Sequence, residues 1–151
     1  MKLVPNSGAD RVIDLLRPHL QPGGQLGCVT PALSLFAFAE LRHALASLEQ
    51  TQLILPPDDE ALEFLGSEGD RIHRNQLQAR WLANQCAQWL STGKVQVRRA
   101  PGRVPQGAAV LRASDGTAQQ VLLGSLAFST DGLGLTPGNP LNLIQASETA
   151  A

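Results

Sequence analysis

A group of positively charged side chains is the clearest candidate for chemistry in this sequence. Lysine and arginine side chains that lie close together can neutralise the phosphates of a nucleic acid. The candidate contacts are Arg74, Lys94, Arg98, Arg99 and Arg103. An alternative is that these charges only keep an exposed strand edge from pairing with another chain. No aromatic stacking platform accompanies them, because most of the four phenylalanines and two tryptophans fall in apolar patterns.

The remaining reactive side chains give little support for metal binding or nucleophilic catalysis. The two cysteines, Cys28 and Cys86, each lie in an apolar pattern, so we expect buried free thiols. The three histidines, His19, His43 and His73, have no paired histidine or acidic residue at ligand spacing. The sequence also lacks the glycine-rich nucleotide motifs and the paired-cysteine and paired-histidine zinc motifs. We therefore expect no metal and no cofactor.

Composition and charge limit the class of protein. With 151 residues, 43% hydrophobic and 17% charged, the chain is expected to form one globular domain over residues 1–151, with a flexible tail at 146–151. The net charge of −1 means that nucleic-acid binding would have to come from a local patch. No apolar run approaches the roughly 20 residues of a transmembrane helix, and none follows Lys2 as a secretory signal would. We expect a cytoplasmic protein without a membrane partner.

Hydrophobic periodicity predicts the elements that must position these residues. Helices are predicted over residues 10–20, 32–48, 58–65 and 72–91. Strands are predicted at residues 26–30, 52–55, 95–97, 108–111 and 121–123. The last two strands are joined through Ser114-Asp115-Gly116, which is typical of a hairpin turn. This alternation predicts an α/β fold with a single mixed β-sheet and helices packed on its faces.

Several features of the second half occur in a fixed order. A helix ends in Gly-Lys-Val-Gln-Val-Arg-Arg (93–99), and a strand begins at Gln106 after a linker with proline and glycine. The hairpin is followed by Val-Leu-Leu-Gly-Ser-Leu-Ala-Phe-Ser (121–129) and then by a segment that ends in Asn-Pro-Leu-Asn-Leu (139–143). This order resembles the phospholipase D-like (His-x-Lys) domain of bacterial nucleases, which also occurs beside Swi/Snf-type helicases and in restriction-system proteins. The resemblance implies the same α/β fold and a homodimer that builds one composite cleft.

The positions that carry catalysis in that family hold other residues here. The resemblance places Gln106 at the nucleophilic histidine, Ala108 at the phosphate-binding lysine and Ala127 at the asparagine that follows Gly-Ser. Pro140 stands where an acidic residue is expected, and Ser125 is retained. Neither glutamine nor alanine can form a phospho-histidine or hold a phosphate by charge. The resemblance therefore implies vestigial positions and no phosphodiesterase activity.

Three functions stay open on these observations. The preferred one is a catalytically inactive phospholipase D-like domain that acts as a binding or assembly module, linked to DNA processing by a helicase or nuclease system. The alternative is a nucleic-acid-binding module that uses the arginine cluster and the vestigial cleft. A further alternative is an atypical phosphodiesterase or nuclease. The apolar residues after Gly-Ser could supply the interface of the homodimer or simply pack in the core; they are Leu126, Phe128, Leu133 and Leu135.

Overall fold

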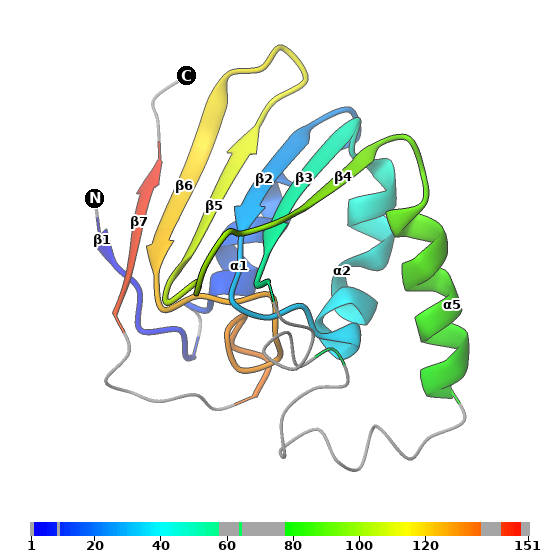
Figure 1. Cartoon of the computed structure of the whole chain (residues 1–151). Coiled ribbons are helices and arrows are strands. Elements are labelled where there is room, and N and C mark those ends of the chain that lie inside the picture. The colour runs from blue at the N-terminus through cyan, green and yellow to red at the C-terminus, as the bar shows by residue number, and fades with distance from the viewer. Residues whose placement is uncertain (1, 9, 58–63, 65–77, 137–142, 149–151) are drawn as a thin grey trace.

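The described residues form one mixed seven-stranded sheet with helices packed against it (Figure 1). The structure is a computed structural model, and it describes residues 2–8, 10–57, 64, 78–136 and 143–148. The strands are β1 (Lys2–Leu3), β2 (Gln25–Val29), β3 (Gln50–Leu55), β4 (Val95–Arg99), β5 (Gly107–Arg112), β6 (Ala118–Gly124) and β7 (Ile144–Glu148). The helices are α1 (Val12–Leu16), α2 (Leu35–Ser47) and α5 (Gln78–Leu90), and a short 3-10 turn, η1 (Arg17–His19), follows α1. The predicted α/β fold with a single mixed sheet is confirmed.

The order of the strands is β1-β7-β6-β5-β2-β3-β4. The strands β2, β3 and β4 run parallel, whereas β2–β5, β5–β6, β6–β7 and β1–β7 are antiparallel pairs. The predicted hairpin is confirmed, since β5 and β6 pair directly from Gly107 opposite Gly124 onward. Its turn uses Gly116 at a φ of +87°, a conformation that favours glycine.

Two predicted helices match the described helices only in part, and a third lies almost wholly outside the described residues. The predicted helix at 32–48 begins later, at Leu35, because Ser34 is extended and its side chain accepts a hydrogen bond from the Phe36 N–H at 3.2 Å. The predicted helix at 58–65 lies outside the described residues except for Phe64. The first part of the helix predicted at 72–91 also lies outside them, and its described part is α5.

The predicted flexible tail begins too early. Residues Ala146–Glu148 belong to β7, which pairs with β6 on one side and with β1 on the other. The inward side chains of β7, Ile144 and Ala146, are only 2% and 3% exposed. The sequence did not predict this strand, because only two of its side chains, those of Ile144 and Ala146, are apolar. The side chain of Ala146 is only a methyl group and gives a weak hydrophobic signal. Residues 149–151 lie outside the described part.

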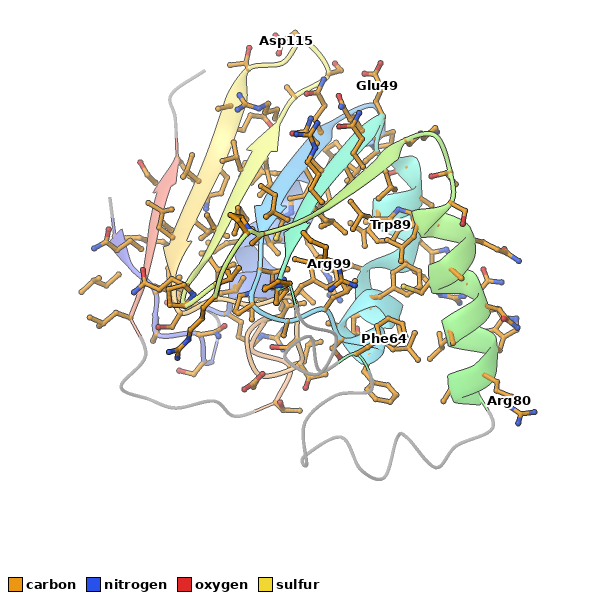
Figure 2. All side chains as sticks on the ribbon, viewed as in Figure 1. Glu49, Phe64, Arg80, Trp89, Arg99 and Asp115 are labelled. Atoms are coloured by element: carbon orange, nitrogen blue, oxygen red, sulfur yellow. The ribbon has the colours of Figure 1, made fainter. Side chains whose placement is uncertain are left out.

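All three described helices cover the same face of the sheet. Inward side chains from β2, β3, β5 and β6 are buried under them, among them Leu53, Leu111 and Leu122. From the helix layer, Phe38 of α2 meets Trp89 of α5 with ring centroids 5.4 Å apart. Figure 2 labels Trp89 on the side of α5 that faces the sheet and α2. The predicted packing of helices on the faces of the sheet is found on one face in the part of the chain that the structure describes. The alternation of apolar and polar residues along the strands cannot reveal which face is covered, because outward positions of the sheet also hold valine and isoleucine.

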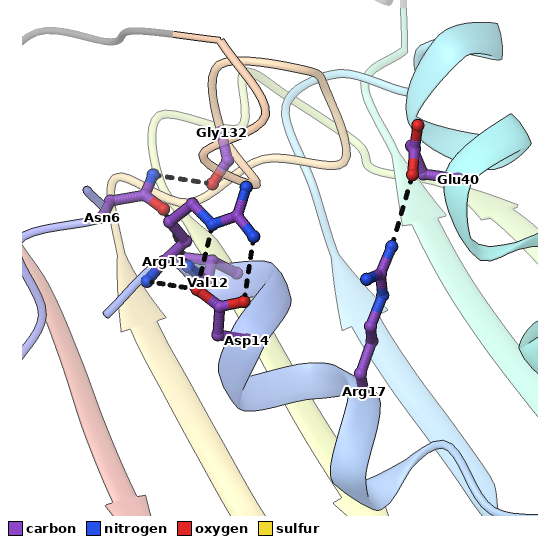
Figure 3. Close-up of polar contacts among 7 residues, drawn as sticks. All are labelled: Asn6, Arg11, Val12, Asp14, Arg17, Glu40 and Gly132. Carbon is purple, nitrogen blue, oxygen red and sulfur yellow. Dashed lines mark hydrogen bonds and ion pairs between the residues drawn. The ribbon is translucent and has the colours of Figure 1, made fainter. Parts of the chain in front are cut away.

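A polar cluster fixes the start of α1 against the segment after β6 (Figure 3). The Asn6 side chain accepts a hydrogen bond from the Val12 N–H at 2.8 Å and donates to the Gly132 carbonyl at 3.1 Å. Asn6 thus satisfies the first N–H of α1, whose N-cap residue is Arg11. Arg11 donates to Asp14 at 2.9 Å and lowers the pKa of that carboxyl.

Candidate functional site

An open groove of about 300 Å³ lies on the uncovered face of the sheet. Its floor is formed by β2 and β5, where Gly27 lies opposite Val110 and Val29 lies opposite Ala108. A Cβ atom added to Gly27 would meet nothing within 4 Å, so the glycine leaves open space rather than relieving a close contact. A glycine inside a strand often marks a place where a ligand or another backbone approaches closely.

Polar side chains from β3 and β4 line one side of this groove. The register pairs Gln52 with Gln96 and Ile54 with Arg98, so these four side chains project from the same face as Gly27. Gln52, Gln96 and Arg98 are all exposed. A guanidinium and two carboxamides beside an aliphatic floor can hold an anionic group by charge and orient it by hydrogen bonds.

The structure does not gather the four vestigial positions into one cluster. Gln106 is exposed directly before β5, and Ala108 lines the groove. Ser125 follows β6, and its N–H donates to the Leu143 carbonyl at 2.8 Å. Ala127 instead lines a small internal cavity beneath α1 and α2, on the helix-covered side. Ala108 therefore shares a surface with Arg98 and not with Ala127.

The predicted arginine cluster separates into members with different surroundings. Arg98 lines the groove, whereas the next residue, Arg99 (labelled in Figure 2), donates from Nη1 to the Pro56 carbonyl at 2.8 Å. Arg103 is exposed in the link between β4 and β5. Lys94 is exposed at the other end of β4, roughly 13 Å from Arg98 along a strand that rises about 3.3 Å per residue. Arg74 lies outside the described residues.

The apolar residues expected at a dimer interface belong to the chain's own core. Leu126, Phe128 and Leu133 are 3%, 3% and 1% exposed, and Leu135 packs against the same core. The Thr30 hydroxyl holds this segment in place, since it accepts a hydrogen bond from the Phe128 N–H at 2.8 Å. These side chains cannot supply an exposed apolar patch, so that part of the prediction is corrected.

A second concavity, which the sequence did not indicate, lies at the edge formed by β1 and β7. It measures about 290 Å³ and is lined by Lys2, Gln120, Ala146 and Glu148. Gln120 is fully buried, and neither atom of its amide has a hydrogen-bond partner among the described residues. A buried amide without a partner costs about 1–3 kcal/mol.

The titratable groups of the described residues do not form a metal centre. No group of three histidine, cysteine or acidic side chains in that part of the chain could hold a metal ion. His19 places Nδ1 3.4 Å from the Gln119 Oε1 atom, and His43 is exposed on α2. Within the described residues, none of the helices has the length and apolar character needed to cross a bilayer.

Both cysteines are buried free thiols, as the sequence predicted. Burial raises the pKa of the Cys28 thiol to about 12 and that of the Cys86 thiol to about 11, from an ordinary value of 9.0. A thiol with so high a pKa stays protonated at neutral pH and is a poor nucleophile and metal ligand. The two cysteines are therefore structural.

These thiols are expected to make the protein less stable in alkaline solution. In the folded state the two thiols keep protons that the unfolded chain releases near pH 9.0. The contribution of the thiols to the free energy of unfolding is therefore fully present below that pH and is lost as the pH rises toward 11 and 12. At pH 10 the loss should be about 1.4 kcal/mol per thiol. The chain has no tyrosine to add to this effect. Urea unfolding between pH 8 and 11 measures it, and Cys28→Ala should flatten the pH dependence; an unchanged slope would contradict the assignment.

Comparison with known proteins gives no family assignment: no protein-family model matches the chain, and no curated protein matches it. The candidate site therefore rests on the geometry of the groove and on the residues that line it.

Proposed function

We propose that this chain is a non-catalytic phospholipase D-like domain that serves as a binding or assembly module, linked to DNA processing by a helicase or nuclease system. The groove is the observation that carries the proposal. Its aliphatic floor includes Ala108, on the strand where the resemblance expects histidine and lysine, and its single guanidinium, that of Arg98, comes from β4. In the described residues, no histidine lines it. Such a surface can hold a partner by apolar contacts and by charge, but it offers no nucleophile for phosphodiester hydrolysis.

The hairpin supports the same proposal. The resemblance implies a strand, a turn and a second strand that ends in Gly-Ser, and β6 ends at Gly124 with Ser125 directly after it. Phosphodiester hydrolysis by the purified protein is the test, and hydrolysis that a substitution in the groove abolishes would contradict the proposal.

Cytoplasmic residence and a homodimer also belong to this proposal. Buried free thiols are typical of proteins that are kept in a reducing compartment. The homodimer rests on the resemblance alone, because the apolar side chains expected at its interface lie in the core.

Nucleic-acid binding is a second candidate. Arg98, one of the predicted phosphate contacts, lines the same groove as Ala108, which the resemblance places at the phosphate-binding lysine. If phosphates bind there, replacing Arg98 and Arg103 together by alanine should weaken binding to every DNA sequence. The slope of log affinity against log salt should flatten by about two units. Arg99 is left in place because its guanidinium holds the Pro56 carbonyl. Fluorescence anisotropy with labelled single-stranded and duplex DNA at several salt concentrations measures both effects.

A matched control removes the same charge elsewhere. Arg17 and Arg80 are exposed on the helical side, and Arg80 points away from the sheet at the start of α5 (Figure 2). Replacing both by alanine should leave the salt slope unchanged if the groove binds the phosphates. Equal losses in the two double variants would show attraction by overall charge, and no binding at low salt would end this candidacy.

A further inference from the structure

One face of the sheet is left open by the described residues, and it includes the parallel strands β2, β3 and β4. Purely parallel sheets are covered on both faces, whereas antiparallel sheets commonly leave one face in solvent, and the sheet here is mixed. Here only one face carries helices in the described part of the chain. Apolar side chains on the other face remain accessible to solvent, with Ile54 37% and Leu123 47% exposed.

The charges on this open face have one sign. Register places Arg98 of β4 and Arg112 of β5 on it, because they pair with the outward residues Ile54 and Gln25. The other polar positions are mostly glutamines, such as Gln52 and Gln96, and the outward positions of the described strands hold no carboxylate. A partner that matches this face needs an apolar centre with acidic flanks.

The shape of the groove indicates how such a partner would sit. Gly27 and Ala108 lie on neighbouring strands and leave space for a large aliphatic side chain between the flanking residues. An amphipathic helix presents leucines at that kind of spacing along one stripe, with charged residues on either side. A second copy of this chain fits less well, since it would bring arginines toward arginines without a carboxylate to pair them. A nucleic acid would find aliphatic side chains at the centre of the face instead of aromatic rings on which bases stack.

We propose that the open face binds an amphipathic helix of a partner protein, whose leucine stripe fills the groove over Gly27 and whose carboxylates pair with Arg98 and Arg112. This inference rests on the proposed function of a binding module and names its surface and the chemistry of its partner.

Two synthetic helical peptides of about 18 residues, or five turns, test the inference. Both carry the same leucine stripe, and they differ only in having glutamate or lysine on its flanks. Fluorescence anisotropy with the full chain at low salt should show the acidic peptide binding at least about tenfold more tightly than the basic one. Arg98→Glu should reduce or reverse this preference.

Gly27→Leu separates binding in the groove from general charge attraction. The new side chain projects into open space, so the fold should be retained while binding of the acidic peptide falls by about tenfold or more. Gly93→Leu is the matched control, because a Cβ atom there also meets nothing within 4 Å and Gly93 lies in the turn between α5 and β4. Circular dichroism and thermal unfolding of both variants verify the fold.

Three results would overturn the inference. One is equal binding of the two peptides, or no binding of either. Another is acidic-peptide binding that Gly27→Leu leaves intact. The third is that Gly27→Leu instead abolishes binding to duplex DNA or dissociates a dimer seen by light scattering, which would assign the face to nucleic acid or to a second copy. If the peptides fail while phosphodiester hydrolysis stays at baseline, the docking inference fails and the non-catalytic assignment stands.

Discussion

Purified protein is expected to leave bis(p-nitrophenyl) phosphate and plasmid DNA uncleaved, with and without divalent metal. In the family that the sequence resembles, catalysis passes through a covalent phospho-histidine, and the corresponding position here is Gln106. The carboxamide nitrogen of glutamine has no lone pair available for attack, and Ala108 offers no charge to a phosphate. Removing even one charge-stabilising group from an enzyme costs about 10²–10³ in kcat. Loss of all of them should leave only the buffer rate.

No described histidine can replace the missing nucleophile. His19 lies next to Gln119 at the helix-covered side of the sheet, and His43 is exposed on α2. A homodimer does not change this, because both copies carry the same residues. Product release followed by absorbance and by gel electrophoresis measures the outcome. Metal-independent turnover that disappears in Gln106→Ala would contradict both the placement of Gln106 at the family's histidine and the proposed function.

A restored pair of residues provides a stricter form of this experiment. Gln106→His with Ala108→Lys places the two groups two residues apart, one directly before β5 and the other in β5 at a position that lines the groove. The double variant is still expected to be inactive. Ala127, at the position of the family's asparagine, lines the internal cavity on the helix-covered side and cannot support a histidine in the groove. Activity in the double variant would show that the supporting residues are dispensable.

The central part of the sheet was predictable because its strands are short apolar runs bounded by turn residues. In β3, Leu53, Ile54 and Leu55 form such a run directly before a pair of prolines, and the hairpin between β5 and β6 has an Asp-Gly turn. The strand β7 was missed because Ala146 and Ser147 are too small to create a hydrophobic signal. The strand β1 was missed because it contains only Lys2 and Leu3.

The groove could not be predicted from the sequence for a different reason. Its residues come from four strands, and Gly27, Gln52 and Gln96 meet only through the register of the sheet. The one local signal was a glycine in the middle of an apolar strand. Arg98 was identified by charge, but its separation from Arg99 follows from the alternation of side chains along β4, which directs Arg99 toward the Pro56 carbonyl.

Gly107→Ala is expected to lower the free energy of unfolding by about 3 kcal/mol, whereas Gly27→Ala should raise it by about 0.5–1 kcal/mol. The two glycines lie in neighbouring strands, but a Cβ atom at Gly107 would collide with the Leu126 backbone carbonyl. The backbone cannot yield there without shifting the segment that enters the core. At Gly27 the added methyl group meets nothing, so the variant gains from the reduced freedom of its unfolded chain.

Urea unfolding of both variants and of Gly124→Ala measures these effects on one scale. Gly124 has a φ of +126°, and its Cβ atom would collide with the Leu143 carbonyl, so this variant should lose about as much stability as Gly107→Ala. Equal midpoints for Gly27→Ala and Gly107→Ala would contradict the close approach seen after β6. Because Gly124 is required where the chain passes from β6 toward β7, the Gly-Ser pair has a structural cause that does not depend on catalysis. The pair therefore carries no weight for activity.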